Sequence, residues 1–214
     1  MKYRFIFDIK NMLHVIFIPI IWFFIIALII HNNINTPIFL EEAISISELS
    51  IPPFAAWWSI FLMQFILEDN GSETLFSYPE RRYNYGITRI LTFTIIYVLC
   101  IIIFVITINS MTDKNIFIPL FLQLTAQSIF FSSLGFLSII TLSSVMWAIT
   151  LVGTYYSIMI FTQGKYIPIF NVFFFNNELL SMDQIFGKLI ITIFLAITIF
   201  IIAQTLLNKY SSYK

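Results

Sequence analysis

Long apolar runs constrain this chain more than any other feature of its sequence. Residues 12–31 and 87–109 are two of these runs, and each is long enough to cross a membrane. A helix of about twenty residues, rising about 1.5 Å per residue, spans a hydrocarbon layer about 30 Å thick. That layer holds no water for main-chain N–H and C=O groups, and a helix satisfies these groups internally. The runs therefore predict an all-α, polytopic membrane protein.

The composition of the chain agrees with the membrane class. Of its 214 residues, 59% are hydrophobic and 10% are charged, whereas soluble domains have about 45–50% and about 25%. The net charge is zero, so no basic surface indicates nucleic acid as a partner. The single cysteine, Cys100, excludes an intramolecular disulfide and disfavours a cysteine-based metal site. We expect residues 1–214 to form one transmembrane domain with no metal site.

Polar breaks between the apolar runs divide the chain into six predicted spans. Before the first span, residues 1–11 predict an amphipathic helix that lies in the membrane interface, with a frayed basic start as the alternative. Six spans place both termini on the same side of the membrane. The predicted spans are about 12–31, 53–67, 87–109, 116–138, 142–161 and 186–207.

The segments between the spans differ in character. Residues 32–52 contain glutamates but no lysine or arginine, and we expect an acidic outer loop of which a part skims the membrane surface. Residues 162–185 are too polar to span the membrane and too aromatic for a free loop. They predict a re-entrant or interface-lying extracellular segment before the sixth span.

The distribution of basic residues predicts the orientation, because lysine and arginine accumulate on the cytoplasmic side. Eight of them fall on the side of the two termini and three on the other side. Both termini are therefore expected in the cytoplasm. The eight are Lys2, Arg4, Lys10, Arg81, Arg82, Arg89, Lys209 and Lys214, and the three are Lys114, Lys165 and Lys188.

Catalytic motifs are missing from the sequence. It has no HExxH, no GxSxG and no GxxxxGK[ST] phosphate loop, so we expect no enzyme activity in this chain. The predicted spans contain neutral polar residues instead. These fit either hydrogen bonding between helices or a mildly polar translocation path. The candidates for such a path are Gln64, Gln123, Gln127, Ser143 and Ser144.

A polar stretch at residues 68–82 separates the second and third spans. It holds four carboxylates and two arginines, and burying such charges in hydrocarbon would cost several kcal/mol each. It also contains an apolar step, Leu75-Phe76, and then Pro79, which can end a short helix. We expect this stretch to lie outside the membrane, either as a surface that a partner binds or as a solvated loop.

The spacing within this stretch resembles a known signature. The pattern Glu68-x-x-Gly71-x-Glu73-Thr74-Leu75-x-Ser77-x-Pro79-x-Arg81 is similar to the cytoplasmic signature of the ATP-binding-cassette type 2 permeases, also called type V exporters. The resemblance implies a coupling helix that docks in a groove of an ATPase subunit. The coupling residues that it implies are Glu68, Gly71, Glu73, Leu75, Phe76, Ser77, Pro79 and Arg81.

The resemblance also implies a function and a set of partners. The chain is expected to be the permease subunit of an ABC exporter and to pair with a second permease subunit, of the same or a homologous chain, and with two ATPase subunits. ATP and Mg²⁺ would bind to the ATPases, and no cofactor to this chain. The expected cargo is a hydrophobic or amphipathic peptide, antimicrobial or lipid-linked compound, and the expected location is a bacterial plasma membrane. The alternative is a membrane protein that binds without transporting, such as a sensor or a bacteriocin-immunity protein.

Overall fold

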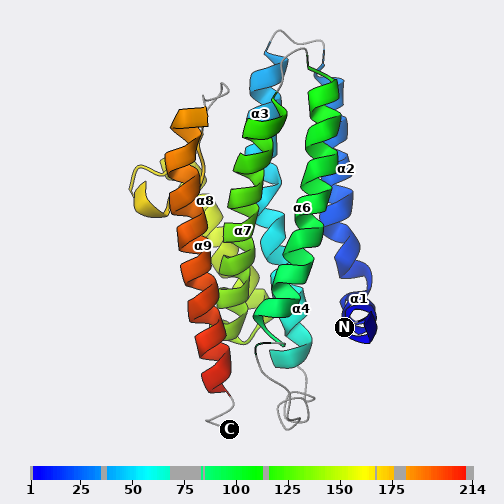
Figure 1. Ribbon diagram of the computed structural model, residues 1–214, viewed down its shortest axis with the longest axis vertical. Helices are drawn as coiled ribbons and strands as arrows, with labels where there is room; N and C mark the ends of the chain where they lie inside the picture. Colours follow the sequence, from blue (N-terminus) through cyan, green and yellow to red (C-terminus); the bar gives the residue numbers. More distant parts are fainter. Residues whose placement is uncertain are drawn as a thin grey trace.

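The computed structural model describes residues 2–34, 38–67, 83, 85–112, 116–166, 168–175 and 182–210, and every regular element within them is a helix. The long helices run side by side along one axis (Figure 1). Among these residues, five helical segments are long and apolar enough to cross a membrane. The chain is therefore a multi-pass membrane protein. The five segments are His14–Asn32, Ile87–Ser110, Phe117–Leu142, Val145–Thr162 and Ile185–Lys209.

These five segments correspond to five of the six predicted spans. The first combines the 3₁₀ turn η1 (Leu13–Ile16) with α2 (Phe17–Asn32), and the third predicted span is α6 (Ile87–Ser110). The last is α9 (Met182–Tyr210), which begins a few residues earlier than predicted. The boundary between the fourth and fifth spans was predicted too early. Those two helices are α7 (Phe117–Leu142) and α8 (Val145–Thr162).

The early boundary has a local cause. Ser138 and Thr141 suggested a polar link, but their hydroxyls donate to carbonyls of their own helix, at Gly135 (2.8 Å) and Leu137 (3.0 Å). A hydroxyl bonded in this way does not interrupt a helix. α7 ends instead where Ser143 adopts a left-handed conformation with φ 51°, and Ser144 then takes an extended conformation before α8.

The prediction for residues 32–52 was wrong over most of its length. Residues 39–50 form α3 (Phe39–Ser50), which is followed by the 3₁₀ turn η2 (Pro52–Phe54) and by α4 (Ala55–Leu67). α3 and α4 run one after the other alongside α6 and α7 (Figure 1). One face of α3 is buried, because its buried side chains recur every three or four residues. That face consists of Phe39, Ala43, Ile44, Ser47 and Glu48.

α7 is the central helix of the bundle and contacts α4, α6, α8 and α9. Its close approach to α4 requires a glycine, because a Cβ on Gly135 would lie 2.7 Å from the carbonyl oxygen of Ala56. One turn earlier, the Ser132 hydroxyl bonds to the hydroxyls of Ser59 on α4 (2.8 Å) and Thr94 on α6 (2.7 Å). These contacts hold α4, α6 and α7 together. α2 and α8, in contrast, leave most of their surface uncovered.

One end of the bundle carries the first helix, α1 (Lys2–Met12), which lies across the long axis. The C-terminal end of α9 and the start of α6 lie at this same end (Figure 1). The polar stretch 68–82 comes between α4 and α6 in sequence and falls outside the described residues, as does the tail 211–214.

Candidate functional site

The break between α3 and α4 leaves main-chain carbonyls without their usual helical donors. Pro52 and Pro53 have no N–H, so the i→i−4 bonds to Glu48 and Leu49 are lost. The N–H of Phe54 then bonds to Ile51 (3.2 Å), as in a 3₁₀ turn. A carbonyl that is buried away from water without a donor destabilises the fold. Carbonyls around this break therefore need donors from elsewhere in the bundle.

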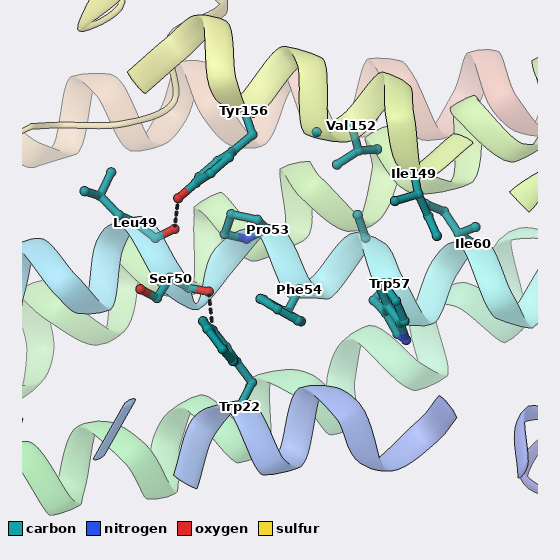
Figure 2. A pocket seen from close by; sticks show the side chains of 12 residues that line it. Trp22, Leu49, Ser50, Pro53, Phe54, Trp57, Ile60, Ile149, Val152 and Tyr156 are labelled. Carbon is teal, nitrogen blue, oxygen red and sulfur yellow. Dashed lines mark hydrogen bonds between the residues drawn. The ribbon is translucent and has the colours of Figure 1, made fainter. Parts of the chain in front are cut away.

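Aromatic side chains from three other helices supply such donors. Each carries a polar N–H or O–H at the tip of an apolar ring, which suits a carbonyl in apolar surroundings. Figure 2 shows two of these bonds as dashed lines, and they reach the break from opposite sides. The bonds run from Trp22 Nε1 on α2 to Ser50 O (3.0 Å), from Tyr156 OH on α8 to Leu49 O (3.0 Å) and from Tyr97 OH on α6 to Ile51 O (2.6 Å).

An apolar pocket of about 380 Å³ lies beside the break, between α2, the α3–α4 segment and α8 (Figure 2). Its volume is within the range of about 300–1,000 Å³ that small-molecule sites occupy. The rings of Trp22 and Phe54 stack at 4.8 Å along one wall, and Tyr156 lies on the opposite wall. The pocket is built to take an apolar molecule or part of one. The lining residues are Trp22, Leu49, Ser50, Pro53, Phe54, Ala56, Trp57, Ile60, Ile149, Val152, Gly153 and Tyr156.

Trp57 lines this pocket with its ring, while its indole Nε1 atom is buried and has no hydrogen-bond partner among the described residues. Buried donors in proteins are nearly always paired, so this N–H is an exception within the bundle.

A second polar site lies at the buried carboxylate of Glu48, whose side chain is 1% exposed. The N–H groups of Phe174 and Phe175 both donate to this carboxylate, the second at 3.2 Å. The Nε2 group of Gln127 on α7 also donates to it (2.8 Å), and Gln123 forms a further hydrogen bond. Successive main-chain N–H groups that converge on one anion are a common form of anion binding. Glu48 thus fixes a segment that is 126 residues away in sequence.

Two more side chains bind the carbonyls of the same segment. The Gln127 amide donates its second N–H to Val172 O (2.9 Å). Lys188 on α9 donates to Phe173 O, and its ammonium group lies 4.7 Å from the centre of the Phe174 ring. We call Glu48, Gln127 and Lys188 the three-helix clamp, because they come from α3, α7 and α9.

The clamp makes the burial of a carboxylate tolerable. An isolated ionised carboxylate in apolar surroundings is very costly, but hydrogen bonds and a nearby cation offset that cost. The structure provides both, because four donors surround Glu48 and the cation of Lys188 is close enough to act on it. Phe175, whose N–H bonds to Glu48, has a left-handed conformation with φ 54°. This conformation is unfavourable by roughly 1–2 kcal/mol for a residue with a Cβ.

A third set of contacts joins helices at the start of α6, directly after the polar stretch 68–82. Arg89 and Asp8 on α1 form a two-bonded ion pair, in which Nε and Oδ2 are 3.1 Å apart. Gln204 on α9 accepts the N–H of Ile87 (2.9 Å) and so caps the first turn of α6. The first turn of α6 is therefore bonded to both α1 and α9.

The predicted path residues fall into three different settings. Gln123 and Gln127 are buried on α7 and bind Glu48. Ser143 and Ser144 form the turn between α7 and α8, not the interior of a span. Gln64 is half-buried on α4. The predicted coupling residues, Glu68 to Arg81, lie outside the described residues.

Sequence reasoning missed both the clamp and the break. Glu48 was assigned to an outer loop, although its spacing from Ala43, Ile44 and Ser47 is that of an amphipathic helix. The adjacent prolines at 52 and 53 were treated as a loop end, although Trp22, Trp57 and Tyr156 all lie in apolar runs where a polar tip needs a partner.

The chain matches no family model, no curated protein and no solved structure. The resemblance of residues 68–82 to the type 2 permeases stays a prediction. The partners and the cofactors that it implies are likewise predictions.

Proposed function

We propose that this chain is the transmembrane permease subunit of an ATP-driven exporter for a hydrophobic or amphipathic cargo. The interrupted helix with an apolar pocket beside it is the observation that carries the proposal. In transporters, discontinuous membrane helices commonly build the substrate site. Irregular backbone within a membrane is tolerated where protein packs around it or where it lines a cavity, and both conditions hold at Pro52-Pro53.

The proposal counts α3, η2 and α4 together as the sixth membrane crossing. Neither helix is long enough alone, but a helical path over residues 39–67 rises about 40 Å at 1.5 Å per residue. The crossing starts with Glu41 and Glu42 in the first turn of α3, which places these two carboxylates toward the outer surface. With this crossing, both termini and residues 68–82 lie on the cytoplasmic side of a bacterial plasma membrane.

Coupling to ATP hydrolysis is proposed to enter through residues 68–82. The joined first turn of α6 supports this role, because a push on the preceding stretch would reach α1 through Asp8 and α9 through Gln204. ATP and Mg²⁺ would bind to separate ATPase subunits. A second permease subunit, of the same or a homologous chain, would cover surface that α2 and α8 leave open.

Copurification tests this function. The tagged chain, extracted in mild detergent from membranes of its native host, should bring down an ATPase subunit in stable stoichiometry. Phe76→Ala should weaken that association by about 2 kcal/mol or more, as loss of a central apolar anchor does. Glu73→Lys should weaken it in a manner that depends on salt, because exposed charges at an interface rim are screened.

A matched control uses a phenylalanine that is exposed elsewhere. Phe194 on α9 is 68% exposed, so Phe194→Ala removes the same side chain outside residues 68–82 and outside the surface of α2 and α8. The control should copurify the ATPase as the parent does. If no ATPase accompanies the parent chain, the exporter proposal fails and a binding protein without transport takes its place.

A further inference from the structure

The segment of residues 172–175 is held almost entirely by side chains. Its backbone follows the 3₁₀ turn η4 (Pro168–Phe170) and carries no regular secondary structure. The N–H groups of Phe174 and Phe175 bond to Glu48, and the carbonyls of Val172 and Phe173 bond to Gln127 and Lys188. The partners in these bonds are therefore the three-helix clamp and not a neighbouring strand or helix.

The clamp has the chemistry of a receptor for a peptide main chain. It offers a carboxylate to two successive N–H groups, and an amide and an ammonium to two successive carbonyls. None of these contacts depends on which side chain the bound segment carries. In peptide recognition, main-chain bonds commonly provide affinity, while pockets select the side chains.

A side-chain pocket accompanies these main-chain contacts. Val172 and Phe173 are 1% and 0% exposed. The Phe173 ring lies 5.7 Å from the ring of Phe131 on α7 and 5.9 Å from that of Tyr156 on α8. Tyr156 also lines the apolar pocket beside the helix break. The site for the Phe173 ring and the proposed cargo site therefore share this one side chain.

The chain's own segment is an imperfect occupant of the clamp. Phe175 takes the left-handed conformation with φ 54°, which is unfavourable for any residue with a Cβ. A separate peptide that enters the clamp is free to place a more tolerant residue there. An exchange of occupants would leave the number of hydrogen bonds to the clamp unchanged and relieve this backbone strain.

We propose that the three-helix clamp is a binding site for the main chain of a short apolar peptide in the conformation of residues 172–175, which fill the clamp until such a peptide displaces them. The inference rests on the proposed function, because it names peptides as the cargo class of the exporter. It also makes residues 172–175 a stand-in for cargo, positioned between α3, α7 and α9.

The test uses a probe peptide and the full chain in lipid nanodiscs. The probe is acetyl-Asn-Val-Phe-Phe-Gly-amide, the sequence of residues 171–174 followed by a glycine, which tolerates the left-handed conformation, and it has a photoreactive diazirine in the valine side chain. The control probe carries N-methyl groups on its last two residues, which removes the two N–H groups that would bond to Glu48 and keeps every side chain. The probe is offered up to millimolar concentration, the effective concentration that a tethered segment reaches.

Capture of the parent probe should saturate and should map to α3, α7 and α9. The N-methylated probe should be captured at least about tenfold less, because each lost bond is to a charged group. Phe173→Ala weakens the resident segment and should raise capture by more than about tenfold. Glu48→Gln, added to Phe173→Ala, should cancel that gain.

Equal capture of the two probes by the parent chain would overturn the proposal, and this comparison needs no variant that has to fold. A folded Phe173→Ala chain that captures no more probe than the parent would overturn it as well. The copurification experiment is independent of this result. If an ATPase copurifies but the two probes are captured equally, the exporter proposal stands and the peptide-site proposal fails. If capture is selective but no ATPase copurifies, the peptide-site proposal stands and the exporter proposal fails.

Discussion

Asp8 on α1 and Arg89 on α6 form an ion pair that is nearly closed to solvent, with side chains 7% and 11% exposed. The pair is two-bonded, through Nε and one terminal nitrogen of the guanidinium, and this geometry is the strongest that arginine and a carboxylate can make. It joins the first helix of the chain to the turn that follows residues 68–82.

Removing one partner should therefore destabilise the bundle. Asp8→Ala leaves the guanidinium buried and unpaired. We expect the free energy of unfolding to fall by about 3–5 kcal/mol, which is measured as a lower melting temperature in detergent. Asp8→Leu combined with Arg89→Met should recover most of that loss, because an apolar pair can replace a buried ion pair. Lys10→Ala, at an exposed position on α1, should leave the melting temperature unchanged. A double variant no more stable than Asp8→Ala would contradict this account.

The aromatic donors at the helix break should contribute through their polar tips. Trp22→Phe keeps a ring in the pocket but removes the N–H that Ser50 O accepts. We expect a cost of about 1–3 kcal/mol, the penalty for a buried acceptor left without a donor. The matched control is Trp147→Phe on α8, where the side chain is 64% exposed and the effect should be small. Thermal denaturation of both variants provides the comparison, and equal effects would argue against the capping role.

Substitution by alanine should change the stability of the protein in opposite directions at two glycines. At Gly135 a Cβ would lie 2.7 Å from Ala56 O and 2.9 Å from Ala56 Cα, so Gly135→Ala should force α4 and α7 apart and cost about 1–3 kcal/mol. At Gly153 on α8 no atom lies within 4 Å of the added Cβ. There Gly153→Ala should stabilise the helix by up to about 1 kcal/mol. The melting temperatures should therefore move in opposite directions. A gain from Gly135→Ala would show that the two helices are not in close contact.

The orientation can be tested with single cysteines at exposed positions. Lys165→Cys, just after α8, should react with an impermeant thiol reagent in intact cells. Lys209→Cys, at the end of α9, should react only after the membrane is permeabilised, if the basic residues have set the orientation. The parent chain is the background control, because Cys100 is half-buried within α6. Labelling of Lys209→Cys in intact cells would show that the orientation is opposite to the predicted one.

The long apolar helices were predictable because each one satisfies its own main-chain N–H and C=O groups within the hydrocarbon layer. The segments His14–Asn32, Ile87–Ser110 and Ile185–Lys209 are each about twenty residues or longer and mostly apolar, and no partner is needed to decide that they are helical. The helix α3 was not recognised because its glutamates dominate its local character. Its placement is decided by Phe174, Phe175 and Gln127, which lie far away in sequence and satisfy Glu48.

The candidate site was predictable only in part, for the same reason. Gln127 was correctly singled out as a polar residue in an apolar helix, but its sequence neighbours do not reveal that it binds Glu48 and Val172. The break at Pro52-Pro53 is visible in the sequence, whereas its three donors come from α2, α6 and α8. Contacts over such distances depend on how the helices pack, and local patterns do not encode that packing.

The capped helix break also has a consequence for the order in which the protein is made. Trp22 precedes its acceptor by 28 residues, but Tyr97 follows Ile51 by 46 residues and Tyr156 follows Leu49 by 107 residues. At a synthesis rate of about 5–20 residues per second, Leu49 waits about 5–20 s for its donor. During that interval the carbonyl has to stay hydrated or be bound by the insertion machinery. We therefore expect the proposed crossing of α3, η2 and α4 to enter the membrane last, after the uninterrupted helices on both sides of it in sequence.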